Sequence, residues 1–116
     1  MQDFQLLLSE PSAGVLELRL TGEVDMATVQ PLRDATSRAV ASGSYQCLVF
    51  DLSALSFIDS SGLHALTDAN RSMAARGGTT KLICAPGNLM KVFELTGLDR
   101  VFSIVGTRAE AIAVAA

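Results

Sequence analysis

The stretch LVFDLSALSFIDSSGL, residues 48–63, decides the fold of this chain. Its beginning, together with Cys47, is a β-branched and aromatic run of the kind that a buried central strand needs. A short turn is expected after residue 50, and a helical pattern follows the turn. Asp59, Ser60 and Ser61 are residue types that cap helix N-termini. The stretch therefore predicts a strand, a turn and a helix, with an exposed serine at the start of the helix.

The residues before this stretch predict a β-hairpin. Two strand-like runs, residues 4–8 and 15–20, are separated by turn-forming residues at 11–14. In the second run, leucines alternate with Glu17 and Arg19, which is the pattern of a sheet with one solvated face. We therefore expect an antiparallel hairpin whose charged side chains face water.

Two helices are expected on either side of the central strand. Pro31 is accepted only in a first helical turn, so the first helix has its N-cap near Thr28, leaves Asp25 outside and ends at residues 41–44. The second helix is expected over residues 61–76, because its apolar residues recur at helical spacing. Its buried stripe comprises Leu63, Leu66, Ala69 and Met73, and it ends at Gly77 and Gly78.

The rest of the chain continues the alternation of strands and helices. Strands are expected at residues 81–84 and 101–105, and a short helix with Asn88 as its N-cap is expected between them. Thr107 and Glu110 have the spacing of a capping box, which predicts a terminal helix.

The order of elements is thus β-β-α-β-α-β-α-β-α, with about five strands and about four helices in one domain, residues 1–116. Strands that alternate with helices predict an α/β fold, a mixed and mostly parallel sheet covered by helices, with the hairpin as its antiparallel edge. In such sheets functional groups gather beyond the carboxyl ends of the strands. The segment 59–62 is expected to lie there.

Composition excludes several classes of function. The chain has 116 residues, a net charge of -3, no Trp and a single Tyr, which argues against a nucleic-acid partner. It shows neither a secretion signal nor the roughly 20 consecutive apolar residues of a membrane span. Cys47 and Cys84 lie in apolar runs and have no metal-binding spacing, so we expect buried thiols. The cytoplasm is the expected location, without membrane insertion.

The loop at residues 59–62 does not have the features of an enzyme. A nucleophilic serine needs a base, and the only histidine, His64, is expected on the outer face of the following helix. Two carboxylates, Asp51 and Asp59, are too few to predict a metal site. The glycines do not have the spacing of a phosphate-binding loop. We expect no catalytic residue, no metal and no cofactor.

Two interpretations of the loop serine remain open on these grounds. One is a plain N-cap residue. The other is a phosphorylation site, because a phosphoryl group of about -1.5 to -2 charges at a helix N-terminus would face unpaired N–H groups and the positive end of the helix dipole. The fold would tolerate that group, whereas a partner surface pressed against the loop would not.

Five segments in this order resemble the successive signatures of the STAS domain, and more narrowly the bacterial anti-sigma factor antagonists. They are TGEVD (21–25), VFDL (49–52), LSFIDSSGL (55–63), Gly77 with Gly78, and VFELTGL (92–98). The resemblance covers nearly all of the chain. It implies a regulatory protein that acts by partner switching, without enzymatic activity of its own.

The resemblance also implies partners and site residues. In that family the unphosphorylated antagonist binds an anti-sigma factor that is itself a serine kinase, and thereby releases the sigma factor. The kinase, which supplies the ATP, then phosphorylates the serine after the loop aspartate, here Ser60, and a metal-dependent phosphatase restores it. Asp25 and Asp59 match acidic positions beside the kinase contact, Ser61 would help to cap the helix, and Gly62 would keep the backbone accessible.

Other functions remain as alternatives to this prediction. The chain could be a STAS subunit of a transporter ATPase, in which the serine is no switch, or it could serve a partner-switching pathway without a sigma factor. A monomer is expected for the free protein.

Overall fold

Five strands form one sheet with helices on both faces. The computed structural model describes residues 3–115, with side chains described for residues 3–112. The strands are β1 (Gln5–Ser12), β2 (Val15–Val24), β3 (Cys47–Ile58), β4 (Thr79–Ile83) and β5 (Ser103–Val105). The helices are α1 (Val29–Ser42), α2 (Ser60–Ala75), α3 (Asn88–Thr96) and α4 (Arg108–Ala115), with a short 3-10 helix, η1, at Leu98–Arg100.

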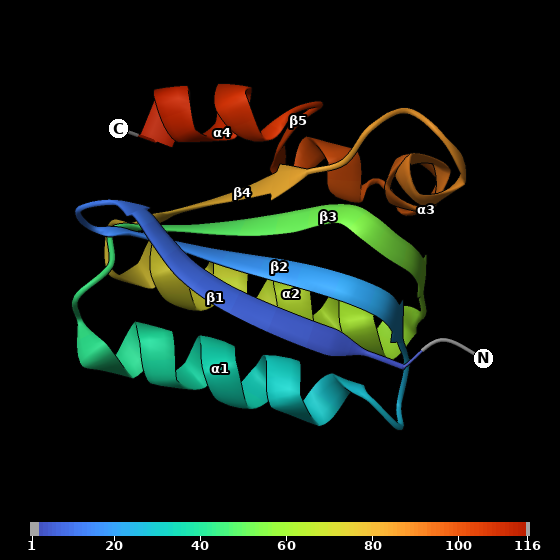
Figure 1. Ribbon diagram of the computed structural model, residues 1–116, viewed down its shortest axis with the longest axis horizontal. Coiled ribbons are helices and arrows are strands. Elements are labelled where there is room, and N and C mark those ends of the chain that lie inside the picture. The colour runs from blue at the N-terminus through green and yellow to red at the C-terminus, as the bar shows by residue number, and fades with distance from the viewer. Residues whose placement is uncertain (1–2, 116) are drawn as a thin grey trace.

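The strands lie in the sheet in the order in which they occur in the sequence. β1 pairs with β2 antiparallel, and all other neighbours are parallel. Figure 1 shows α1 and α2 on one face of the sheet and α3 and α4 on the other. The predicted fold class, the order of elements and the antiparallel edge hairpin are therefore confirmed.

The main core lies between the sheet and the helices α1 and α2. Phe50 of β3 is fully buried at its centre, and the predicted apolar stripe of α2 faces it. On the other face of the sheet, Phe93 of α3 and Phe102 meet edge to face with ring centroids 6.3 Å apart. Cys47 and Cys84 are buried free thiols, as expected from the apolar runs that contain them.

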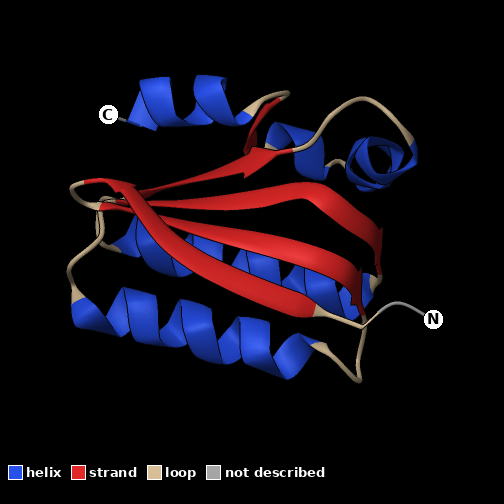
Figure 2. Ribbon diagram, viewed as in Figure 1, coloured by secondary structure: helices blue, strands red, loops and turns tan. Residues whose placement is uncertain are grey.

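The predicted turn after residue 50 is wrong, because β3 continues to Ile58. The hairpin strand is also longer than expected, since β2 runs to Val24 rather than residue 20. The two extensions pair with each other, and Val24 lies opposite Ile58 at the end of the ladder. Long-range pairing thus overrides the local turn signals of the Asp and Ser residues. Figure 2 shows β3 bending near this end.

Two irregularities in the β2–β3 ladder reconcile the polar sequence with a strand. The ladder shifts register after Arg19 and again after Gly22. At the first shift, the Asp51 carboxylate accepts hydrogen bonds from the Ser53 N–H (3.0 Å) and the Ser53 hydroxyl (2.6 Å). Bulges of this kind insert residues into one strand and bend it. Here they carry the strand to the edge where the helix begins.

Gly22 is required at the second shift. Its φ of +92° is unfavourable for other residues, and a Cβ atom there would lie 2.1 Å from the carbonyl oxygen of Asp3. The Ser56 hydroxyl donates a hydrogen bond of 2.9 Å to the Gly22 carbonyl oxygen across the ladder. The N-terminal segment, β2 and β3 are therefore in close contact just before the strands end.

The prediction that Glu17 faces water is wrong. Glu17 is buried, because α4 covers this face of the sheet, and its carboxylate accepts two hydrogen bonds from Nε of Arg108 at 3.0 and 2.7 Å. Arg19, on the same strand, is exposed as expected. Thr107 caps α4 as predicted, since the Glu110 N–H donates to its hydroxyl at 3.3 Å. The capping box is incomplete, because the Glu110 carboxylate accepts from that hydroxyl (3.0 Å) and not from the Thr107 N–H. Arg108 in the first turn of α4 thus anchors the helix to β2.

Replacement of Arg108 by Ala is expected to lower the free energy of unfolding by about 1–2 kcal/mol, because it leaves a buried carboxylate without its partner. Urea unfolding followed by circular dichroism measures this change. The double variant Glu17→Gln/Arg108→Ala should recover part of the loss, since the uncompensated charge is then removed. Equal stability of Arg108→Ala and the unmodified protein would contradict a structural role for the pair.

Helix and strand boundaries differ from the predictions by a few residues. α2 begins at Ser60 rather than 61, and Asn88 is the first residue of α3 rather than its N-cap, which is Gly87. The last strand begins at Ser103, because η1 ends at Arg100 and the N–H groups of Val101 and Phe102 still turn back to the Leu98 carbonyl oxygen. The predicted N-cap of α1 at Thr28 is confirmed.

Candidate functional site

The ends of β2 and β3 bring the two predicted acidic residues together. Val24 and Ile58 are paired, and the Asp59 N–H donates a 3.0 Å hydrogen bond to the Val24 carbonyl oxygen. Asp25 and Asp59 follow these paired residues, so they start neighbouring loops. This is the arrangement that the sequence predicts for the carboxyl ends of parallel strands.

Asp59 is the N-cap of α2. Its Oδ1 accepts hydrogen bonds from the Ser61 N–H (2.9 Å), the Gly62 N–H (3.2 Å) and the Ser61 hydroxyl (2.5 Å). The Ser61 hydroxyl is the main reason why the pKa of Asp59 lies below its usual value. Burial opposes this effect, and the backbone N–H groups of Gly62, Ser61 and Met26 lower the pKa further. Asp59 is therefore ionised at neutral pH.

The two adjacent serines have different surroundings. Ser61 is partly buried, and its hydroxyl is bonded to Asp59. Ser60 is the first residue of α2 and is exposed, and within residues 3–112 its hydroxyl has no hydrogen-bond partner. The interpretation of Ser60 as a plain N-cap residue is therefore wrong, because Asp59 is the N-cap of α2. Ser60 presents a free hydroxyl to any molecule that approaches the start of the helix.

Gly62 is buried, contrary to the implication that it keeps the backbone accessible. A Cβ atom at this position would lie 2.5 Å from Cγ1 of Ile58 and 2.8 Å from Cγ1 of Val24. Both neighbours are β-branched and stiff at χ1. Glycine therefore lets the first turn of α2 pack directly on the strand ends and sets the position of Ser60.

Thr28 organises the loop that carries Asp25. The sequence predicts Thr28 only as the N-cap of the first helix. Its hydroxyl donates to the Glu23 carbonyl oxygen and accepts from the Asp25 N–H, both at 2.9 Å. The Asp25 carboxylate in turn accepts from the N–H groups of Ala27 (2.9 Å) and Thr28 (3.1 Å). The loop beside Ser60 is therefore held by its own hydrogen bonds.

Replacement of Asp59 by Ala is expected to lower the free energy of unfolding by about 1 kcal/mol at neutral pH, through loss of the cap. The pKa of Asp59 is lower in the folded than in the unfolded state, so its contribution is complete above the unfolded value of about 3.9. That contribution is lost as the pH falls through the folded value. Urea unfolding at several acidic pH values should show the two proteins converging, with Ser60→Ala as control. A difference that stays constant into acid would contradict this account.

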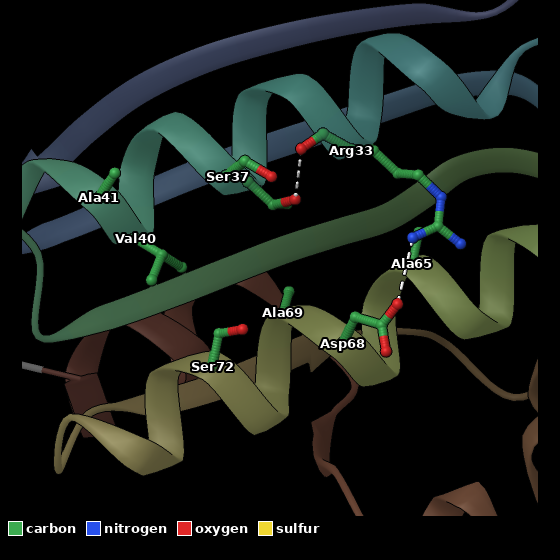
Figure 3. A pocket seen from close by; sticks show the side chains of 9 residues that line it. Arg33, Ser37, Val40, Ala41, Ala65, Asp68, Ala69 and Ser72 are labelled. Carbon is green, nitrogen blue, oxygen red and sulfur yellow. Dashed lines mark hydrogen bonds and ion pairs between the residues drawn. The ribbon is translucent and has the colours of Figure 1, made fainter.

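A hollow of about 350 Å³ lies elsewhere, between α1 and α2 (Figure 3). Arg33 of α1 and Asp68 of α2 form an ion pair of 3.1 Å across it, and Ser37 and Ser72 are among its other lining residues. None of the predicted site residues lines this hollow. It is separate from the candidate site.

The Ser60 hydroxyl has no catalytic partner among the described residues. Among the described residues, no base is bonded to the Ser60 hydroxyl, and no group of three or more His, Cys, Asp or Glu residues is placed to hold a metal ion. Ser60 is therefore an exposed hydroxyl with no bonded base within residues 3–112.

A model of the STAS domain family matches residues 9–111, and the chain belongs to this family. This chain is 35% identical over 81 residues to an anti-sigma F factor antagonist of Lysinibacillus sphaericus. The matched region covers 70% of this chain and 69% of that protein. The solved structure of an anti-sigma factor antagonist from Mycobacterium paratuberculosis superposes with a TM-score of 0.87 at 29% identity, covering 97% of this chain and 94% of that one.

The phosphorylated form of SpoIIAA, a Bacillus cell fate determinant, is also similar to this chain. It superposes with a TM-score of 0.76 at 29% identity, covering 94% of this chain and 97% of SpoIIAA. Within residues 3–115, none of the helices has the length and apolar character that a membrane crossing requires.

Proposed function

We propose that this protein is an anti-sigma factor antagonist that acts by partner switching. In its unphosphorylated form it binds an anti-sigma factor that is also a serine kinase, and the sigma factor is released. The kinase transfers a phosphoryl group from its own ATP to Ser60, and the phosphorylated protein no longer binds. The antagonist itself is neither an enzyme nor a holder of metal or cofactor.

The observation that carries this proposal is the contrast between Ser60 and Ser61. Ser60 is exposed at the first position of α2, while the Ser61 hydroxyl is bonded to Asp59 at 2.5 Å. Of the two, only Ser60 offers a hydroxyl that a kinase can reach without breaking the helix cap. The existence of a phosphorylated form of SpoIIAA supports the same chemistry in this chain.

The charges around Ser60 explain why phosphorylation would end binding. The N–H groups of Ser61 and Gly62 already donate to Asp59, so they are not free to donate to a phosphate on Ser60, in contrast to what the sequence alone suggests. The new group of about -1.5 to -2 charges would instead stand beside the ionised Asp59 and near Asp25. In the complex it would also face the nucleotide from which it came. Repulsion and bulk then favour release.

The remaining partners follow from the cycle. A metal-dependent serine phosphatase would remove the phosphoryl group and return the protein to its binding form. We place the cycle in the cytoplasm, with the free protein as a monomer. The phosphatase rests on the resemblance to the anti-sigma factor antagonists, and the location and the monomeric state are part of the proposal.

The test is phosphorylation by the purified anti-sigma serine kinases of the host. Each kinase is incubated with the protein and ATP, and the phosphorylated peptide is identified by mass spectrometry. The expected product carries a single phosphate on Ser60. If no host kinase modifies Ser60, and if Ser60→Asp leaves kinase binding unchanged, the switch is excluded. The role of a transporter ATPase subunit would then be the better explanation.

A further inference from the structure

Two large apolar side chains are exposed where β2 and β3 end, and the sequence pattern assigns a role to neither. Met26 is 82% exposed and Phe57 is 47% exposed. Phe57 lies opposite Glu23 in the β2–β3 ladder, one position before the paired Val24 and Ile58. Since side chains alternate along a strand, Phe57 and Glu23 point away from the core that buries Val24 and Ile58.

Met26 lies on the same end of the molecule. It follows Asp25 directly and lies two residues after Val24, whose carbonyl oxygen accepts the Asp59 N–H at 3.0 Å. Met26 and Phe57 are thus neighbours of both acidic loops. We call Glu23, Asp25, Met26, Phe57 and Asp59 the docking patch, which adjoins Ser60.

The charged part of the docking patch is not neutralised by an ion pair within residues 3–112. The ion pairs within residues 3–112 join Arg33 and Arg71 to Asp68, and Arg108 to Glu17, and none involves an acid of the patch. The patch is therefore negative at its rim and apolar at Met26 and Phe57. Two copies of it would repel each other, whereas Lys and Arg side chains would complement it.

We infer that Met26 and Phe57 are the apolar anchors by which this protein holds its kinase, inserted into an apolar recess that Lys and Arg side chains surround. The inference rests on the proposed function and specifies the chemistry of that partner. The acids of the docking patch orient the partner and speed its approach, while the two apolar side chains provide most of the affinity. Ser60, at the border of this contact, is thereby brought to the bound nucleotide.

The division of roles follows from the physics of interfaces. A buried aromatic side chain removes a large apolar area from water and is a frequent site of concentrated binding energy. Exposed charges at an interface rim mainly change the association rate and its dependence on salt. Met26 and Phe57 should therefore set the dissociation rate, and Asp25 the association rate.

Surface plasmon resonance with the purified kinase that phosphorylates Ser60, in the presence of ADP, separates these effects. Met26→Ala and Phe57→Ala should each weaken binding by about 10- to 30-fold, chiefly by faster dissociation. Leu7→Ala is the matched control, because Leu7 is 66% exposed but lies on β1, two strands away from Phe57. It should bind within about twofold of the unmodified protein. Phe57→Leu, which keeps an apolar side chain, should recover part of the affinity.

The role of charge is tested by measuring the association rates of the unmodified protein and of Asp25→Asn at low and at high ionic strength. The unmodified protein should associate roughly tenfold more slowly at high salt, and Asp25→Asn should reduce this dependence. Binding of Phe57→Ala as tight as that of the unmodified protein overturns the inference and leaves the proposed function standing. Dimerisation through Phe57, seen by analytical ultracentrifugation, also overturns it. If the unmodified protein itself neither binds nor accepts phosphate, the proposed function fails and the inference with it.

Discussion

Replacement of Ser60 by Ala is expected to abolish phosphorylation and to leave the fold and kinase binding intact. Ser60 is exposed, and its hydroxyl has no partner among the described residues, so its removal costs the fold less than about 0.5 kcal/mol. Without the hydroxyl, the kinase has no acceptor. The variant should therefore stay bound to the kinase after ATP is added, whereas the unmodified protein is released.

Ser61→Ala is the matched control for this experiment. It removes the 2.5 Å hydrogen bond to Asp59 and should lower stability slightly, yet it leaves the Ser60 hydroxyl in place. We expect incorporation of one phosphate in Ser61→Ala and of none in Ser60→Ala, measured by mass spectrometry. Phosphorylation of Ser60→Ala, or its release on addition of ATP, would contradict the assignment of the switch.

Gly62→Val is expected to lower the free energy of unfolding by about 3 kcal/mol, the upper part of the range for overpacking a core. The new side chain would have to occupy space held by Ile58 and Val24, where even a Cβ atom comes within 2.5 and 2.8 Å. The strand ends cannot yield easily, because Val24 and Ile58 are buried and paired. The first turn of α2 must shift instead, and Ser60 shifts with it.

Urea unfolding measures the stability of Gly62→Val, and the phosphorylation rate at Ser60 reports the displacement of the helix start. Ser72→Ala, an exposed change farther along α2, serves as control and should unfold like the unmodified protein. If Gly62→Val were as stable as this control, the close packing of α2 on the strands would be disproved.

The sequence predicts the fold well where the signal is local. Apolar periodicity identifies the buried stripe of α2, and Pro31 places the start of α1. It predicts less where long-range contacts decide the structure. The sequence predicts a turn in the second half of β3, because the Asp and Ser residues there are turn formers. Only pairing with β2 makes this segment a strand. The sequence predicts that Glu17 faces water, because its partner, Arg108, is 91 residues away along the chain.

Predictability of the site has the same limits. The sequence places the serine at a helix start, and family resemblance distinguishes Ser60 from Ser61. It does not reveal that Asp59 occupies the N–H groups of the first turn, because any residue of the segment 59–61 could act as the cap. Nor does it show that Met26 and Phe57 are exposed, since Met and Phe are among the residue types that are most often buried.

The central claim is that one phosphate on Ser60 decides whether this protein binds its kinase. The most direct measurement compares two preparations by isothermal titration calorimetry against the same kinase with ADP, one unphosphorylated and one fully phosphorylated on Ser60. The account predicts that phosphorylation weakens binding by at least about 100-fold, since charge and bulk appear inside the contact. Equal affinities of the two preparations would contradict it.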